Sequence, residues 1–179
     1  MNKAASTGHG DALPVERWQT RVMSAPSLDT TVYLDRLDRV RAAMGEHDVD
    51  AVMLSVGHDL PYLTGYTSMP LERLTLLIVP REGDPSLLIP GLEAARVTAQ
   101  PGVFQLLPWT ETDDPTAIAS TLVAGAHRIA VGDQMWARFL VEMLPHLSGV
   151  EFTRAVDVVG ALRRTKDQAE IDALAAAGA

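Results

Sequence analysis

The chain has 179 residues, the size of one folded domain, and its 47% of apolar and 21% of charged residues are typical of a folded protein rather than a disordered one. Its net charge of −8 argues against nucleic-acid and anionic-membrane partners, because both of these bind basic faces. The chain has no cysteine, which excludes disulfides and thiolate chemistry within it and favours a reducing compartment such as the cytoplasm.

The first 30 residues are predicted to be an N-terminal tail that contains one short helix. Residues 1–12 are small and polar, and they lack the apolar segment of a signal peptide. Pro14 suits the first position of a helix, and Pro26 would end it. No stretch of the chain approaches the roughly 18 apolar residues of a membrane span.

A longer helix is predicted to follow the tail and to stop at Gly45. Asp29 to Thr31 supply candidates for its N-cap, and its arginines and aspartates are assigned to the solvent face. Its apolar residues recur at helical spacing, at Tyr33, Leu37, Val40 and Met44.

Six short apolar segments are predicted to be strands of a buried sheet. The second and third are joined by the turn sequence "REGDP", so they form an antiparallel hairpin, and this excludes a purely parallel sheet. The six segments are residues 51–55, 74–79, 86–90, 103–109, 128–132 and 150–155.

Helices are predicted between these strands, and Asp114 with Pro115 marks the start of one of them. The alternation of helices and strands predicts an α/β fold with a mixed, roughly six-stranded sheet and helices on both faces. The helical segments are residues 91–100, 114–127 and 134–147, with a last helical region that begins near residue 156.

The residues alone predict no catalytic centre and no metal site. The phosphate-loop, dinucleotide, nucleophile-elbow and zinc-helix motifs are absent. Asp113 and Asp114 are adjacent carboxylates, but an aspartate before proline is an ordinary helix cap. The five histidines are scattered without ligand spacing, at His9, His47, His58, His127 and His146.

Two stretches carry a resemblance to a known family. The first runs from Asp48 to Val97 and includes "YLTGY", and the second is "LRRTKDQAEIDALAAAGA" at the end of the chain. Together they resemble the N-terminal domain of the creatinase, prolidase (Xaa-Pro dipeptidase) and aminopeptidase P family. Asp167 stands where the family more often has Ser or Thr. The matching positions are Asp50, Tyr62, Leu63, Thr64, Gly65, Tyr66, Leu162, Arg163, Lys166, Glu170, Ile171, Leu174 and Ala177.

The resemblance implies a division of labour between two domains. Residues 31–161 would be the N-terminal α/β domain, and residues 162–179 would begin a linker helix to an absent catalytic domain of the pita-bread fold. In the family that second domain holds two divalent metal ions (Mn, Co or Zn), so no cofactor is expected in this segment. The segment itself would be non-catalytic, would shape the cleft for a proline-containing peptide, and would mediate contacts in a homodimer or higher homo-oligomer.

Most of the matching residues are expected to serve the fold. Asp50 would turn the chain into the first strand, Tyr62 and Leu63 would pack a short helix on the sheet, and Gly65 would adopt a positive φ at the end of that helix. The linker charges, including Arg163, would lie on a solvated face or at the seam between domains.

Arg73 is the one candidate for substrate binding. In relatives such as creatinase, the loop after "YLTGY" reaches the active site of the partner subunit, and an arginine stands at about this position. A guanidinium suits a substrate carboxylate, but Arg73 could equally be a solvated residue at the start of a strand. Glu72 and His58 are weaker candidates of the same kind.

Two alternatives remain open from the sequence. The first is a stand-alone binding or interaction domain without a catalytic partner, against which the apolar residues of the last helix argue because they would need a cover. The second is an unrelated doubly wound ligand-binding domain, against which the absence of a Gly-rich phosphate turn argues.

Overall fold

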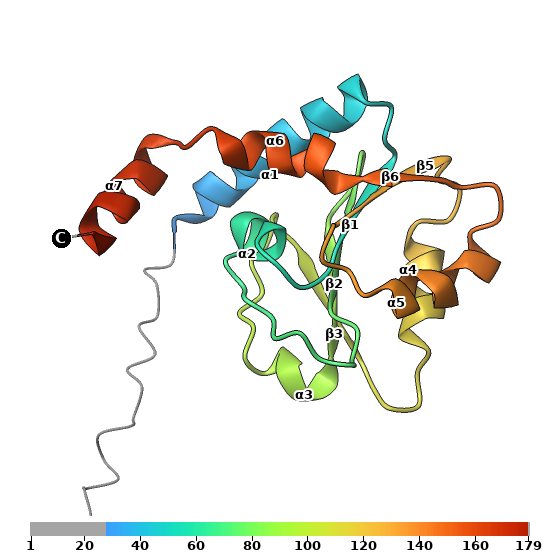
Figure 1. Cartoon of the computed structure of the whole chain (residues 1–179). Coiled ribbons are helices and arrows are strands. Elements are labelled where there is room, and N and C mark those ends of the chain that lie inside the picture. Colours follow the sequence, from blue (N-terminus) through green and yellow to red (C-terminus); the bar gives the residue numbers. More distant parts are fainter. Residues whose placement is uncertain (1–27, 179) are drawn as a thin grey trace, which may run out of the picture.

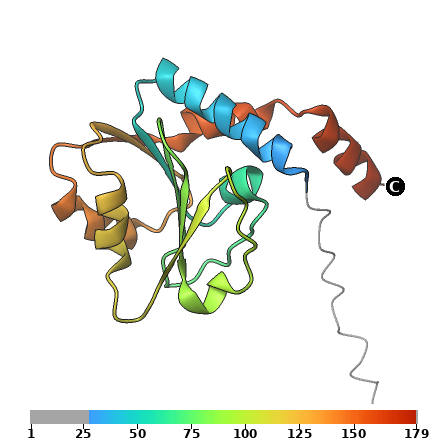
Figure 2. The same ribbon diagram turned by 180° about the vertical axis from the view of Figure 1, so that it is seen from behind.

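A computed structural model describes residues 28–178, so the predicted tail helix lies outside the described residues. These residues form a six-stranded sheet in the order β4-β3-β2-β1-β5-β6, with helices on both faces (Figures 1 and 2). The predicted mixed α/β fold is therefore confirmed. The strands are β1 (Ala51–Leu54), β2 (Leu76–Pro80), β3 (Ser86–Pro90), β4 (Gln105–Trp109), β5 (Arg128–Val131) and β6 (Glu151–Arg154).

β2 runs against the direction of the other strands, because it pairs antiparallel with both β1 and β3 while the remaining pairs are parallel. Side chains alternate along each strand, so β1 sends Val52 and Leu54 into one core and Ala51 and Met53 into the other. The first core lies under α1 (Thr30–Glu46), α2 (Asp59–Thr64) and α6 (Val159–Arg164). The second lies under α4 (Pro115–Leu122) and α5 (Ala137–Met143).

α1 begins as predicted, with the Asp29 side chain accepting the backbone N–H of Thr31, but it does not stop at Gly45. The helix continues to Glu46, and Asp48 takes the left-handed conformation with a φ of 51°. The N–H of Val49 then bonds to the carbonyl of Met44 at 2.9 Å. This geometry ends the helix with an aspartate in place of glycine.

The helices on the sheet are shorter than predicted. The segment 91–100 contains only α3 (Gly91–Ala94), because Val97 turns onto the first core and the Gln100 amide donates to the carbonyl of Thr64 at 2.9 Å. The segment 134–147 contains α5 and a short 3-10 helix, η2 (Leu144–His146), which has Pro145 in its first turn. Asp114 caps α4 as predicted, through the N–H groups of Thr116 and Ala117.

β2 begins two residues later than predicted because the preceding carbonyl groups bind side chains instead of a neighbouring strand. The carbonyl of Leu74 accepts the Trp109 indole N–H at 2.9 Å, and that of Thr75 accepts the Ser55 hydroxyl at 2.9 Å. Leu74 and Thr75 are nevertheless buried. Similarly, β4 begins after Phe104, whose N–H bonds to the Gln100 carbonyl in a turn.

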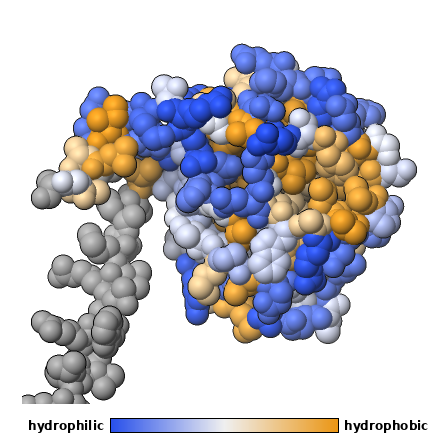
Figure 3. All heavy atoms as spheres, viewed as in Figure 1, coloured by the Kyte–Doolittle hydropathy of each residue, from blue (hydrophilic) through white to orange (hydrophobic). Residues whose placement is uncertain are grey.

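The segment expected to be one linker helix is broken into two. After η3 (Ala155–Asp157), α6 ends at Arg164, Thr165 has an extended backbone, and α7 (Gln168–Ala177) starts at a capping box formed by Asp167 and Glu170. α7 projects from the body, and apolar atoms gather on it (Figures 1 and 3). Within residues 28–178, no helix is long and apolar enough to cross a membrane.

Candidate functional site

Arg73 lies where the loop after α2 enters the sheet. Its side chain is 35% exposed, and one guanidinium nitrogen lies 2.8 Å from a carboxylate oxygen of Glu111, in the loop between β4 and α4. The next residue, Leu74, is held by the indole of Trp109. The backbone at Arg73 is therefore anchored, while its charged group faces an exposed partner.

Arg73 also lines a cavity of about 360 Å³ between that loop, α4 and α5. Trp109 and Phe139 form apolar walls, and Arg138 pairs with Glu142 of its own helix at 3.5 Å. The charges of Arg138 and Glu142 cancel each other, as do those of Arg73 and Glu111. Glu72 and Asp114 also line the cavity, so its lining carries an excess of negative charge, and a ligand carboxylate at Arg73 would have to displace Glu111 from this exposed ion pair.

The two weaker candidates lie in different places. Glu72 lines the same cavity as Arg73. His58 is an exposed residue at the N-cap of α2, where its side chain makes no capping bond, and it lines a separate cavity of about 140 Å³ beside Asp59 and Arg163. Glu72 and Arg73 therefore line one cavity, and His58 lines a different one.

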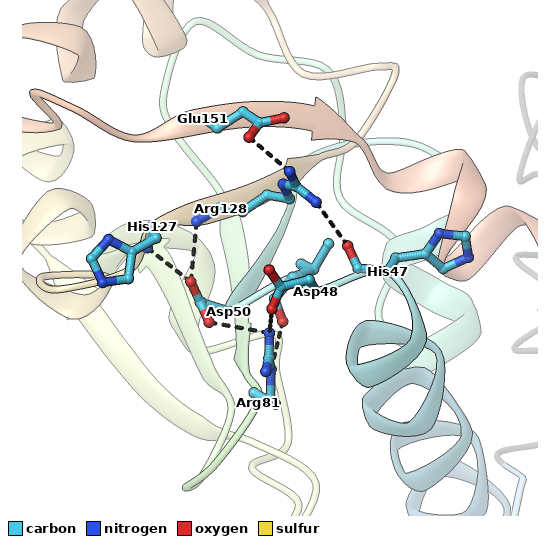
Figure 4. Close-up of polar contacts among 8 residues, drawn as sticks. His47, Asp48, Asp50, Arg81, His127, Arg128 and Glu151 are labelled. Carbon is cyan, nitrogen blue, oxygen red and sulfur yellow. Dashed lines mark hydrogen bonds and ion pairs between the residues drawn. The ribbon is translucent and has the colours of Figure 1, made fainter.

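Asp50 joins three strands at the end of the sheet where β1 begins (Figure 4). One carboxylate oxygen accepts the backbone N–H groups of His127 and Arg128 at 2.8 and 3.1 Å, and the other lies 3.2 Å from the guanidinium of Arg81. The rings of His127 and His47 point away from this network, to which they contribute only backbone groups. Asp50 therefore serves the fold as expected, but its carboxylate does so by linking the start of β1 to β5 and to Arg81, rather than by turning the chain into β1.

Replacing Asp50 with Asn is expected to lower the free energy of unfolding by about 1 kcal/mol at pH 7, because the charge in these hydrogen bonds is lost. The backbone N–H groups of His127 and Arg128 hold the pKa of Asp50 below its usual value in the folded protein. A lowered folded-state pKa stabilises the fold above the unfolded pKa of about 3.9, and this stabilisation disappears as pH falls through the folded pKa.

Urea unfolding of the parent and of Asp50→Asn at pH 7 and near pH 3 checks this expectation, and the difference between them should shrink at the lower pH. Asp48→Asn is the matched control. Asp48 also faces Arg81, at 3.3 Å, but its side chain is 83% exposed and accepts no backbone N–H from β5. An Asp48→Asn effect as large as that of Asp50→Asn would contradict the assigned role.

The "YLTGY" segment also serves the fold. Tyr62 and Leu63 of α2 are buried in the first core, and burial raises the pKa of Tyr62. The Thr64 hydroxyl donates to the carbonyl of Leu60 and accepts the N–H of Tyr66. Gly65 has a φ of 70° and ends α2, so the predictions for this segment are confirmed.

Arg36 is the residue that sequence reasoning missed, because it was assigned with the other charged residues to the solvent face of α1. It is 3% exposed, and its guanidinium lies 4.1 Å from the centre of the Tyr62 ring. Its position contained the signal: it lies three residues after Tyr33 and four before Val40, on the apolar stripe of the helix.

The linker charges, expected on a solvated face or at the seam between domains, make contacts within this domain, while Lys166 is exposed and Arg163 is partly exposed. Arg163 of α6 pairs with Asp59 of α2 at 2.8 Å. Glu170 lies 3.7 Å from Arg36. The Lys166 ammonium donates to the carbonyl of Arg163. These charges therefore fix the end of the domain to its helical face.

The described residues do not fit a catalytic metal pair. Nowhere in residues 28–178 do three His, Asp or Glu side chains gather closely enough to hold a metal ion. No step of metal chemistry can be assigned to these residues.

Comparison with known proteins agrees with the fold. The chain is 35% identical over 161 residues to the probable dipeptidase PepE of Mycobacterium tuberculosis, a match that covers 88% of the chain and 43% of that protein. The crystal structure of dipeptidase PepE from Mycobacterium ulcerans matches with a TM-score of 0.74 and 36% identity, over 83% of this chain and 41% of that one.

A third match is to a structure that consists of a single domain. The structure of the N-terminal domain of Xaa-Pro dipeptidase from Lactobacillus brevis matches over 73% of this chain and 99% of that one, with a TM-score of 0.63. Its identity of 20% shows likeness of fold alone. The chain thus spans about two fifths of the length of the PepE dipeptidases and nearly all of the Lactobacillus brevis domain.

The family model of the Creatinase/Prolidase N-terminal domain matches residues 36–165, which is more than half of the chain. This match overturns the alternative of an unrelated doubly wound ligand-binding domain. The chain belongs to the Creatinase/Prolidase N-terminal domain family.

Proposed function

We propose that this chain is the non-catalytic N-terminal domain of a metal-dependent Xaa-Pro dipeptidase, in which it shapes the substrate cleft and contributes to contacts between subunits. The observation that carries the proposal is the match to the PepE dipeptidases, which covers 88% of this chain but only 43% of the relative's length. The remaining length of such a relative is enough for a second domain.

Two features of the chain support a partner domain. Ile171 and Leu174 on α7 are 46% and 61% exposed, and apolar side chains on one projecting helix gain stability when they are covered. The charges Arg163 and Glu170 hold the neighbouring segments to the domain. A partner packed on α7 would thus meet a fixed surface. We also propose a cytoplasmic location for the protein, as expected from the sequence.

The division of labour is tested by titrating the purified chain with Mn²⁺, Co²⁺ and Zn²⁺ in an isothermal calorimeter. We expect no stoichiometric binding in the micromolar range, because a catalytic metal site needs several carboxylate or imidazole ligands at one point. Micromolar binding of one or two ions per chain would contradict the proposal and would place a metal site in this segment.

The alternative of a stand-alone interaction domain predicts a different result. The exposed residues of α7 would then bind a separate protein or a second copy of the chain. Sedimentation of the chain alone and of an Ile171→Ser/Leu174→Ser variant separates these outcomes. A stand-alone domain that binds a second copy through α7 expects an oligomer that the variant dissociates, whereas the proposed function, in which a second domain covers α7, expects the same sedimentation from the chain and from the variant.

A further inference from the structure

Arg36 carries a charge that lies almost wholly inside the domain, with a side chain 4% exposed. One guanidinium nitrogen donates to the carbonyl of Tyr62 at 2.8 Å. The other lies 3.3 Å from a carboxylate oxygen of Asp167 and 3.7 Å from one of Glu170. A buried guanidinium requires counter-charges, and both of these come from the first turn of α7 and its N-cap.

Each of the two carboxylates serves two purposes. Asp167 accepts the backbone N–H of Glu170 with one oxygen at 2.8 Å and faces Arg36 with the other. Glu170 accepts the N–H of Asp167 with one oxygen at 3.1 Å and also faces Arg36 with the other. The capping box and the ion pairs therefore form together, so the start of α7 is coupled to its attachment. We call Arg36, Asp167 and Glu170 the Arg36 clasp.

The rest of α7 projects away from the sheet (Figures 1 and 2), with Ile171 and Leu174 exposed. On its other side, α6 is tied to α2 by Arg163 and Asp59. Thr165, between the two helices, has an extended backbone with a ψ of 114°, so the helices are not one continuous rod. The direction of α7 therefore depends on the backbone conformation at Thr165, which acts as a pivot, and on the contacts of the first turn of α7.

We propose that Arg36 is a positioning residue that fixes the direction in which α7 leaves the domain. The clasp holds α7 at its first turn, and without it the helix pivots about Thr165. The inference does not rest on the proposed function, because the direction of α7 is a property of this chain. Should α7 join a second domain, the same residue would set the angle between the two domains.

The experiment is a distance measurement by double electron–electron resonance. Since the chain has no cysteine, spin labels can be attached at Ala42→Cys on α1 and Ala176→Cys on α7, both of them exposed. We expect one narrow distance distribution in the labelled parent and a broad one in Arg36→Met. Hydrogen exchange of the α7 amides should be about tenfold to a hundredfold faster in Arg36→Met. This factor corresponds to the stability lost when one charged hydrogen bond is removed.

Two further variants make the result decisive. Arg39→Met is the matched control, because Arg39 lies on the same helix but is 37% exposed and pairs with Asp35 of that helix, so its distribution should stay narrow. Asp167→Asn/Glu170→Gln keeps side chains that cap a helix but removes both charges facing Arg36, so its distribution should broaden. A narrow distribution in folded Arg36→Met would overturn the proposal, and so would one in the carboxylate variant, which decides alone if Arg36→Met fails to fold.

Discussion

Replacing Gly65 with Val is expected to lower the free energy of unfolding by roughly 2–4 kcal/mol, the sum of backbone strain and overpacking. Gly65 has a φ of 70°, where a β-branched residue is strained. A Cβ atom at this position would also collide with the hydroxyl oxygen of Tyr33, whose side chain is buried. For a domain of this size the melting temperature should fall by about 5–15 °C.

Gly125→Val separates the two causes. Gly125 has a φ of 86°, but a Cβ atom there would meet nothing within 4 Å, so this variant carries the strain without the collision. Tyr33→Phe removes the nearest atom, so Gly65→Val should cost less in that background. Thermal melts of the parent, the three single variants and the Tyr33→Phe/Gly65→Val double variant measure both effects. Equal losses for Gly65→Val and Gly125→Val would show that the contact with Tyr33 is unimportant.

In the oligomeric dipeptidase that we propose for this chain, replacing Arg73 with Ala should lower kcat/KM for an Xaa-Pro substrate by about tenfold to a hundredfold, the loss of one charged hydrogen-bonded contact of roughly 1.5–3 kcal/mol. The proposed role of Arg73 is to bind a substrate carboxylate, which displaces Glu111 from its ion pair with Arg73. Arg73→Lys should recover only part of the activity, because an ammonium lacks the planar fork of a guanidinium. Steady-state kinetics of the variants provide the measurement.

Two controls accompany the Arg73 variants. Arg41→Ala removes a guanidinium that bonds to the carbonyl of Gly83 on the turn between β2 and β3, and it should leave kcat/KM unchanged. Glu111→Gln weakens the pair that competes with substrate, so it should not raise KM. If Arg73→Ala retains the parent's kcat/KM while remaining folded, Arg73 is a surface residue that happens to line a cavity.

The strands and the order of elements could be predicted because each buried segment is a short apolar run between turn residues. The hairpin of β2 and β3 follows from its "REGDP" turn, which depends on neighbours in sequence and which turn chemistry reports directly. The short helix that ends at Gly65 is instead implied by the family resemblance of "YLTGY".

The errors lie where distant side chains compete with local preference. Trp109 and Ser55 take the carbonyl groups that would have extended β2, and they are far from it in sequence. The side chain of Gln100 similarly bonds to the end of α2 instead of continuing a helix. Arg36 is buried because its counter-charges arrive from the far end of the chain, and charge alone suggested a solvent-facing residue.

The central claim is that this domain serves a dipeptidase whose catalytic groups lie outside the described residues. It is tested most directly by assaying Xaa-Pro dipeptide hydrolysis with Mn²⁺ for this chain and for the complete product of its gene, here called the extended protein. The account predicts hydrolysis by the extended protein and none by the chain alone. Hydrolysis by the chain alone, or inactivity of the folded extended protein across a panel of Xaa-Pro dipeptides, would contradict it.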